Sequence, residues 1–133
     1  MPIVVDCSAL VFATTESHPA ARRLLWRLSV DTCHAPHLID AELGSVLARK
    51  VRRGELSPRH AITVLHEAPH LVDQRHGHRG ALATAAWELR ENVSFYDGLY
   101  VCLAIALGAV LLTLDRRLLT APGLGSVVEL VAP

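Results

Sequence analysis

The chain has 133 residues, of which 51% are hydrophobic and 20% are charged, and its 13 basic side chains balance 13 acidic ones. This length is typical of one domain, and we expect residues 1–133 to form a single domain. The apolar content excludes an intrinsically disordered chain, and the neutral balance excludes a protein that recruits nucleic acid by its overall positive field.

Three scattered cysteines without a Cys-x-x-Cys pair argue against a disulfide framework or a zinc ribbon. The N-terminal residues lack the basic start and the long apolar run of a signal peptide. The uncharged stretch 99–114 is interrupted by Gly108 and is shorter than the roughly 20 residues that a membrane span needs. These features predict a cytoplasmic protein with no membrane partner.

Short apolar or β-branched runs alternate with amphipathic segments along the chain. The short runs predict strands at 3–5, 32–35, 71–73, 110–114 and 127–131. The longer segments predict helices at 7–14 (a short helix or a turn), after Pro19, and at 38–53, 57–67, 80–91, 95–107 and 115–120. Strands that alternate with helices in this way favour an α/β fold whose parallel sheet is covered on both faces.

Three aspartates stand out by their position relative to these elements. Asp6 and Asp115 each follow a predicted strand directly, which is where proteins with parallel sheets place their functional residues. Asp97 is the only charged residue in the segment 94–114, and burying an isolated carboxylate is costly unless it is paired or bound to a metal. Each aspartate is also a candidate for helix capping, the ordinary structural role of Asp at such a position.

Two further acids lie on the amphipathic helix predicted at 38–53. At about 100° per residue, Glu42 falls beside the apolar stripe that contains Ile39 and Leu43. Asp40 borders the other edge of this stripe and competes for the same role. The alternative for Glu42 is a boundary residue whose stem packs on the core while its carboxylate stays in water.

Carboxylates that converge at one end of a sheet repel one another unless protons or cations neutralise them. A site made of carboxylate oxygens suits Mg²⁺ or Mn²⁺ and not zinc. Such ions also bind phosphate oxygens and activate water for phosphodiester hydrolysis. The set Asp6, Glu42, Asp97 and Asp115 therefore predicts a centre that depends on Mg²⁺, with Mn²⁺ as the other ion, and that acts on an anionic substrate.

Three stretches of the chain resemble the motifs of PIN-domain ribonucleases. Residues 5–10, Val-Asp-Cys-Ser-Ala-Leu, are similar to the opening D-x-S motif, and residues 96–104, Tyr-Asp-Gly-Leu-Tyr-Val-Cys-Leu-Ala, resemble the third acidic motif. Residues 111–118 resemble the closing T-x-D-x-x-L stretch, and Glu42 occupies the place of the second acidic residue. The length and the order of the motifs resemble the VapC toxins of VapBC toxin–antitoxin pairs.

The resemblance implies a three-layer α/β/α fold around a mainly parallel sheet and a Mg²⁺-dependent endoribonuclease whose substrate is RNA. It also implies inhibition by a VapB-type antitoxin and formation of a homodimer. By the same resemblance, the four acids are the catalytic metal ligands, and Ser8 and Thr113 are polar supports that hydrogen-bond to them. Arg116 and Arg117 follow Asp115 directly, so we expect one of the two to contact RNA.

The other polar or reactive side chains have simpler interpretations. Positive residues within 49–53 end a predicted helix and suit its dipole better than a phosphate-binding role. The stretch His76-Gly77-His78 lacks a third metal ligand at a recognisable spacing and is interpreted as a solvated loop. We expect Cys7 to be buried, and Trp26 and Trp87 to lie in the core or in an interface.

Three other functions compete with the ribonuclease. An aspartyl phosphotransferase is disfavoured because Asp6-Cys7-Ser8 is D-x-S and not the D-x-D of such phosphatases. A phospho-receiver-like module needs paired acids after the first strand and a lysine near a late strand, and the only lysine is Lys50. A catalytically inactive α/β binding module is disfavoured because the four acids are intact.

Overall fold

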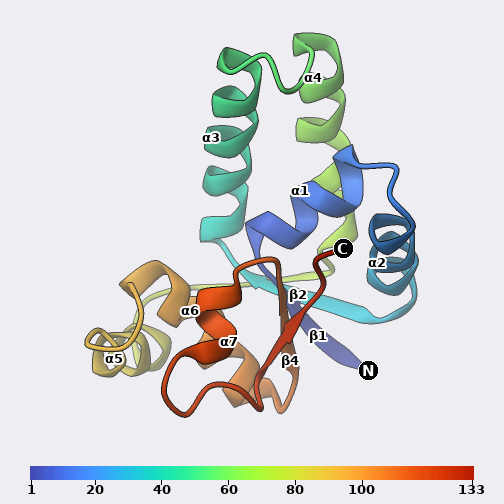
Figure 1. Ribbon diagram of the computed structural model, residues 1–133. Helices are drawn as coiled ribbons and strands as arrows, with labels where there is room; N and C mark the ends of the chain where they lie inside the picture. The colour runs from blue at the N-terminus through green and yellow to red at the C-terminus, as the bar shows by residue number, and fades with distance from the viewer.

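The computed structural model describes residues 1–133 and has a five-stranded sheet at its centre (Figure 1). The strands are β1 (Pro2–Val5), β2 (Thr32–Pro36), β3 (Gln74–His76), β4 (Val110–Thr113) and β5 (Val128–Leu130). Their order is β3-β2-β1-β4-β5, and all neighbouring pairs run parallel. The α/β fold with a parallel sheet, predicted from the alternation of elements, is confirmed.

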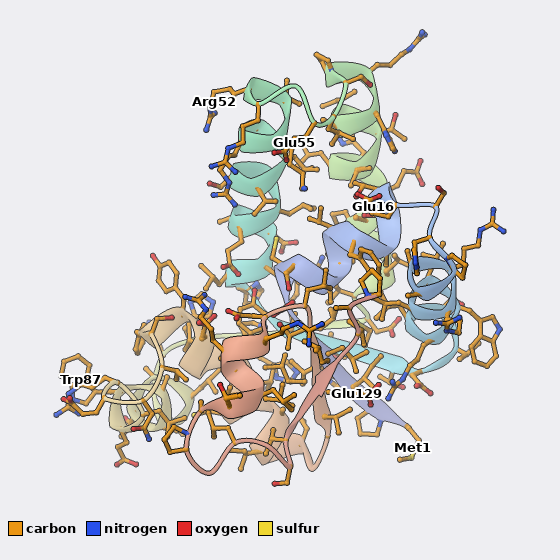
Figure 2. The ribbon with its side chains drawn as sticks, in the orientation of Figure 1. Met1, Glu16, Arg52, Glu55, Trp87 and Glu129 are labelled. Carbon is orange, nitrogen blue, oxygen red and sulfur yellow. The ribbon has the colours of Figure 1, made fainter.

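Helices connect the strands and cover both faces of the sheet. They are α1 (Cys7–Thr15), α2 (Pro19–Val30), α3 (Leu38–Arg52), α4 (Pro58–Glu67), a 3-10 helix η1 (Ala68–Leu71), α5 (Ala81–Glu88), α6 (Phe95–Leu107) and α7 (Arg116–Thr120). The chain adds β2 and β3 on one side of β1 and β4 and β5 on the other, so right-handed crossovers place α1–α4 on one face and α5–α7 on the opposite face. The α3–α4 hairpin extends well beyond the sheet (Figure 1), and Figure 2 places Arg52 and Glu55 near its outer end.

The central strand and α6 carry the deepest part of the core. Val4 and Val5 of β1 are fully buried, as expected for a strand that is covered on both faces. In α6 the run from Gly98 to Ala104 is buried, Ser94 caps the first turn, and Gly108 ends the helix in the left-handed conformation at φ +62°. Crossing a lipid bilayer would require a longer or more apolar helix than any in this fold.

The third strand differs from the prediction. The apolar run at 71–73 predicted a strand, but the strand is Gln74–His76. Val72 packs in the core just before it, and the Asp73 carboxylate accepts the Cys33 backbone N–H at 2.8 Å, before the strand begins. Because β3 lies at the edge of the sheet, its polar residues tolerate the exposure that a central strand would not.

The packing of α5 on α6 explains the glycine that follows Asp97. A Cβ atom on Gly98 would lie 3.2 Å from the Ala86 carbonyl oxygen and 3.3 Å from the Ala86 Cα, so a glycine permits this close approach of the two helices. Helix α5 ends at Glu88, three residues before its predicted end at 91. The α5–α6 contact therefore holds the first turn of α6, which carries Asp97.

Candidate active site

Asp6 lies at the carboxyl end of the central strand, between β1 and α1. It caps α1, because its Oδ1 accepts the Ala9 backbone N–H at 2.9 Å. The Ser8 hydroxyl donates to the same oxygen at 2.7 Å, and the Thr113 hydroxyl donates to Oδ2. Burial raises the pKa of Asp6 above its ordinary value, although these hydrogen bonds act in the opposite direction.

Thr113 joins the ends of two neighbouring strands. Its side chain carries a hydroxyl and yet is fully inaccessible to solvent. Its hydroxyl donates to Asp6 and also accepts the Asp115 backbone N–H at 3.0 Å. The Ser8 hydroxyl accepts the Leu114 N–H at 3.1 Å. Because β1 and β4 pair in parallel, these hydroxyls link the two strand ends around the Asp6 carboxylate.

Glu42 approaches the same region from α3 and is half-buried. Tyr100 of α6 donates its phenolic O–H to Glu42 Oε1. Burial raises the pKa of Glu42, the hydrogen bond from Tyr100 lowers it, and the negative charges of Asp6 and Asp97 raise it further. Burial and the neighbouring Glu42 also raise the pKa of Tyr100 far above its ordinary value, so the phenol is a hydrogen-bond donor at neutral pH.

The other acid of this helix, Asp40, faces away from the cavity. Its two oxygens accept hydrogen bonds from the Arg75 guanidinium at 2.7 and 3.0 Å, in a bidentate ion pair. The sequence left Asp40 and Glu42 as competitors for one role. Only Glu42 contributes to the lining of the cavity that the other acids share.

Asp97 and Asp115 occupy the first turns of two helices. The Ser94 hydroxyl accepts the Asp97 backbone N–H at 3.1 Å, and burial raises the pKa of Asp97, with a further contribution from the charge of Asp115. Asp115 caps α7 by accepting the Arg117 backbone N–H at 3.0 Å, and the Arg117 guanidinium donates to both of its oxygens at 3.1 and 2.8 Å. This pairing lowers the pKa of Asp115. Asp97 is therefore held through its backbone and Asp115 through its carboxylate, and both residues line the same cavity.

A cavity of about 530 Å³ opens beside the carboxyl ends of β1 and β4. The acids that line it are Asp6, Glu42, Asp97 and Asp115, together with Glu16 at the far end of α1 (Figure 2). The basic residues that line it are Arg49, Lys50 and Arg117. Residues far apart in sequence thus form one hollow that is lined by both acidic and basic side chains.

The chemistry of this donor set suits a hard divalent cation. No group of three or more His, Cys, Asp or Glu side chains has an arrangement that could hold a metal ion as the side chains stand. The available ligands are nevertheless carboxylate oxygens, which Mg²⁺ and Mn²⁺ prefer. Burial penalises the charged forms of Asp6, Glu42 and Asp97, and a cation among them would offset this penalty.

For two cationic residues that line the cavity, the sequence favoured a role with the helix dipole over phosphate binding. Arg49 and Lys50 of α3 line the cavity, and so does Arg117, whereas Arg116 does not. The sequence does contain a signal for the first of them. Arg49 follows Glu42 by seven residues, or about two helical turns, so both side chains lie on the same face of the helix.

No histidine lines the cavity. Cys7 does line it but is unreactive there. His76 ends β3, and its Nε2 lies 2.9 Å from the His34 Nδ1, while the His78 Nε2 accepts the Leu38 N–H at 2.8 Å. These contacts replace the solvated loop that the sequence predicted. Cys7 is buried, as predicted, and burial raises the pKa of its thiol to about 12, so it is not a thiolate nucleophile at neutral pH.

The two tryptophans lie on the surface. Trp26 of α2 is 66% exposed and Trp87 of α5 is 59% exposed, so neither lies in the core, and an interface position stays a prediction for both. Figure 2 shows Trp87 directed away from the rest of the protein. The buried faces of these helices are filled by smaller side chains, Leu24 and Leu28 in α2 and Ala86 in α5.

Comparisons with known proteins identify relatives of this chain. A family model described as PIN domain matches residues 3–124. Ribonuclease VapC1 of Mycobacterium tuberculosis (strain ATCC 25618 / H37Rv) is 44% identical over 128 residues, which cover 96% of each chain. The crystal structure of PAE2754 from Pyrobaculum aerophilum has a TM-score of 0.69 at 26% identity and covers 90% of this chain and 78% of that one. The crystal structure of VapBC2 from Rickettsia felis has a similar fold, with a TM-score of 0.71 at 17% identity over 97% of this chain and 98% of that one.

Proposed function

The chain belongs to the PIN domain family, and we propose that it is an endoribonuclease toxin that hydrolyses RNA phosphodiester bonds. The observation that carries the proposal is the convergence of Asp6, Glu42, Asp97 and Asp115 on one cavity at the carboxyl ends of the sheet. RNA as the substrate is supported by Ribonuclease VapC1, which shares 44% of its residues with this chain over nearly its whole length.

The four acids would hold the divalent cation, with Mg²⁺ as the expected ion and Mn²⁺ as the other. When bound, such a cation lowers the pKa of a water molecule and offsets the negative charge that builds on the phosphate. The hydrogen bonds to Asp6 hold its carboxylate in a fixed direction. One of these carboxylates would also act as general base and accept a proton from that water.

The cationic residues of the cavity are the proposed contacts for RNA phosphates. Arg49 forms no salt bridge, and Lys50 has one loose pair at 3.7 Å with Glu55, so both charges are available to a ligand. Arg117 is already paired with Asp115, and its guanidinium is exposed. We therefore assign phosphate binding beside the acids to Arg49 and Lys50 first, and to Arg117 in addition.

Cleavage of a labelled RNA tests the proposed activity. We expect hydrolysis with Mg²⁺ that EDTA abolishes, and a loss of roughly 100-fold or more in rate for Asp6→Asn and for Asp97→Asn. Asp40→Asn is the matched control, because it neutralises an acid of α3 whose carboxylate binds Arg75 outside the cavity. Full activity in both Asp6→Asn and Asp97→Asn would refute the assignment.

A VapB-type antitoxin and a homodimer complete the proposal. An antitoxin could block the acidic cavity with an arginine side chain, whose planar fork matches carboxylates. The support for a homodimer is a second hollow, lined mostly by apolar residues of α5 and α6, beside which Ile105 is 53% exposed. Sedimentation of the purified chain measures the dimer. We expect Ile105→Lys to convert it to a monomer, and a monomeric unmodified chain would contradict this part of the proposal.

The competing functions find no support in the site. A phospho-receiver would need its lysine near a late strand, whereas Lys50 lies near the end of α3. An aspartyl phosphotransferase would need an acid at the position of Ser8, whose hydroxyl instead donates to Asp6. A binding module without catalysis would have no use for several carboxylates whose charged forms are penalised by burial.

A further inference from the structure

We propose that Tyr100 positions the Glu42 carboxylate for binding of the divalent cation, an inference that rests on the function proposed above. Tyr100 lies on α6 one turn after Asp97 and is 2% exposed. Its phenolic O–H donates to Glu42 Oε1, and it lines the same cavity as the four acids. The contact connects α6 with α3, two helices that cover opposite faces of the sheet.

The Glu42 carboxylate is held by fewer hydrogen bonds than the carboxylates of Asp6 and Asp115. Asp6 accepts three hydrogen bonds and Asp115 also accepts three, whereas Tyr100 is the one hydrogen-bond partner of the Glu42 carboxylate. Glu42 also has a longer side chain with more rotatable bonds, on a helix that extends away from the sheet (Figure 1). Without a partner, this side chain would sample several rotamers.

A buried tyrosine is well suited to hold a metal-binding carboxylate. Its ring is fixed by core packing, so the position of the hydroxyl is defined by the fold and not by a flexible chain. Donation to Oε1 leaves Oε2, and the remaining lone pair of Oε1, available to a cation. Partners of this kind orient the groups that bind a metal, and their loss weakens binding even though they never touch the ion.

Tyr100→Phe removes the hydroxyl and keeps the ring, so it tests the role of the donor. We expect the affinity for Mn²⁺, measured by calorimetry on the metal-free protein, to fall about tenfold. RNA cleavage at subsaturating Mg²⁺ should fall by a similar factor and recover as Mg²⁺ is raised. Tyr96→Phe is the matched control, because Tyr96 lies on the same helix, is 58% exposed and does not line the cavity. It should leave both measurements unchanged.

A double-mutant cycle with Glu42→Ala separates positioning from packing. If Tyr100 acts through Glu42, Tyr100→Phe causes no further loss of Mn²⁺ affinity once Glu42 is replaced. An equal loss in both backgrounds, or an unchanged affinity in Tyr100→Phe alone, would overturn the inference while the proposed function stands. Unchanged Mn²⁺ affinity and cleavage in Glu42→Ala would overturn the assignment of Glu42 as a metal ligand, and the role of Tyr100 with it.

Discussion

Replacement of Thr113 by valine removes the hydroxyl that joins β1 to β4 and leaves the shape of the side chain almost unchanged. The hydroxyl donates to the Asp6 carboxylate and accepts the Asp115 N–H at 3.0 Å, in a position with no access to solvent. A hydrogen bond to a charged group contributes about 1.5–3 kcal/mol, and a buried donor without a partner costs about 1–3 kcal/mol. The Asp115 N–H also loses its acceptor, but Asp115 is only partly buried, so this loss adds only part of the second penalty. We therefore expect the free energy of unfolding to fall by about 2–4 kcal/mol.

Urea and thermal unfolding of the metal-free protein measure this loss. At this chain length it corresponds to a fall of roughly 10 °C in Tm. RNA cleavage should fall about 10- to 100-fold, because Asp6 loses one of the groups that orient it. Thr113→Ser is the matched control, since it keeps the hydroxyl and loses only a methyl group, at a cost of about 1 kcal/mol. The reasoning fails if Thr113→Val unfolds and cleaves RNA like the unmodified protein.

Three further predictions follow from the cavity and its surroundings. In the metal-free protein, the free energy of unfolding should fall as the pH rises from 4.5 through the raised native pKa of Glu42, because the native state binds more protons than the unfolded state in that window. Urea unfolding at a series of pH values should show a shallower decline for Glu42→Gln. An equal slope in the two proteins would contradict the raised pKa. Arg49→Ala should raise KM several-fold with little change in kcat and should weaken the salt dependence of RNA binding by about one unit of slope, whereas an effect on kcat alone would argue against phosphate binding. Gly98→Ala should lower the free energy of unfolding by about 1 kcal/mol, because crowding against the Ala86 carbonyl at 3.2 Å outweighs the gain of about 1 kcal/mol in helix propensity. A higher Tm for the variant would contradict this and show that the α5–α6 contact can relax.

Several parts of the site were predictable because they depend on local sequence. Asp6 and Asp115 could be placed at strand ends, since apolar runs mark the strands and an acid follows each run directly. Asp97 could be singled out by its isolation in an apolar helix, whose start and end at Ser94 and Gly108 are also local signals.

Other parts depended on partners far away along the chain. The choice between Asp40 and Glu42 could not be made from their shared helix, because Arg75, which binds Asp40, lies 35 residues later on the edge strand. Tyr100 is one of many apolar or aromatic residues in α6, and only the approach of α3 gives its hydroxyl a carboxylate to hold.

The sequence by itself determined the order of strands and helices, their caps and the presence of four acids at the right places along the chain. Periodicity and capping are short-range properties, so they can be seen within a few residues of each element. The tertiary structure alone decided that β1 and β4 are neighbours, and therefore that Asp6 and Thr113, 107 residues apart, share a hydrogen bond. Strand order follows from how the crossovers pack over the whole sheet, a property that no local stretch of sequence encodes.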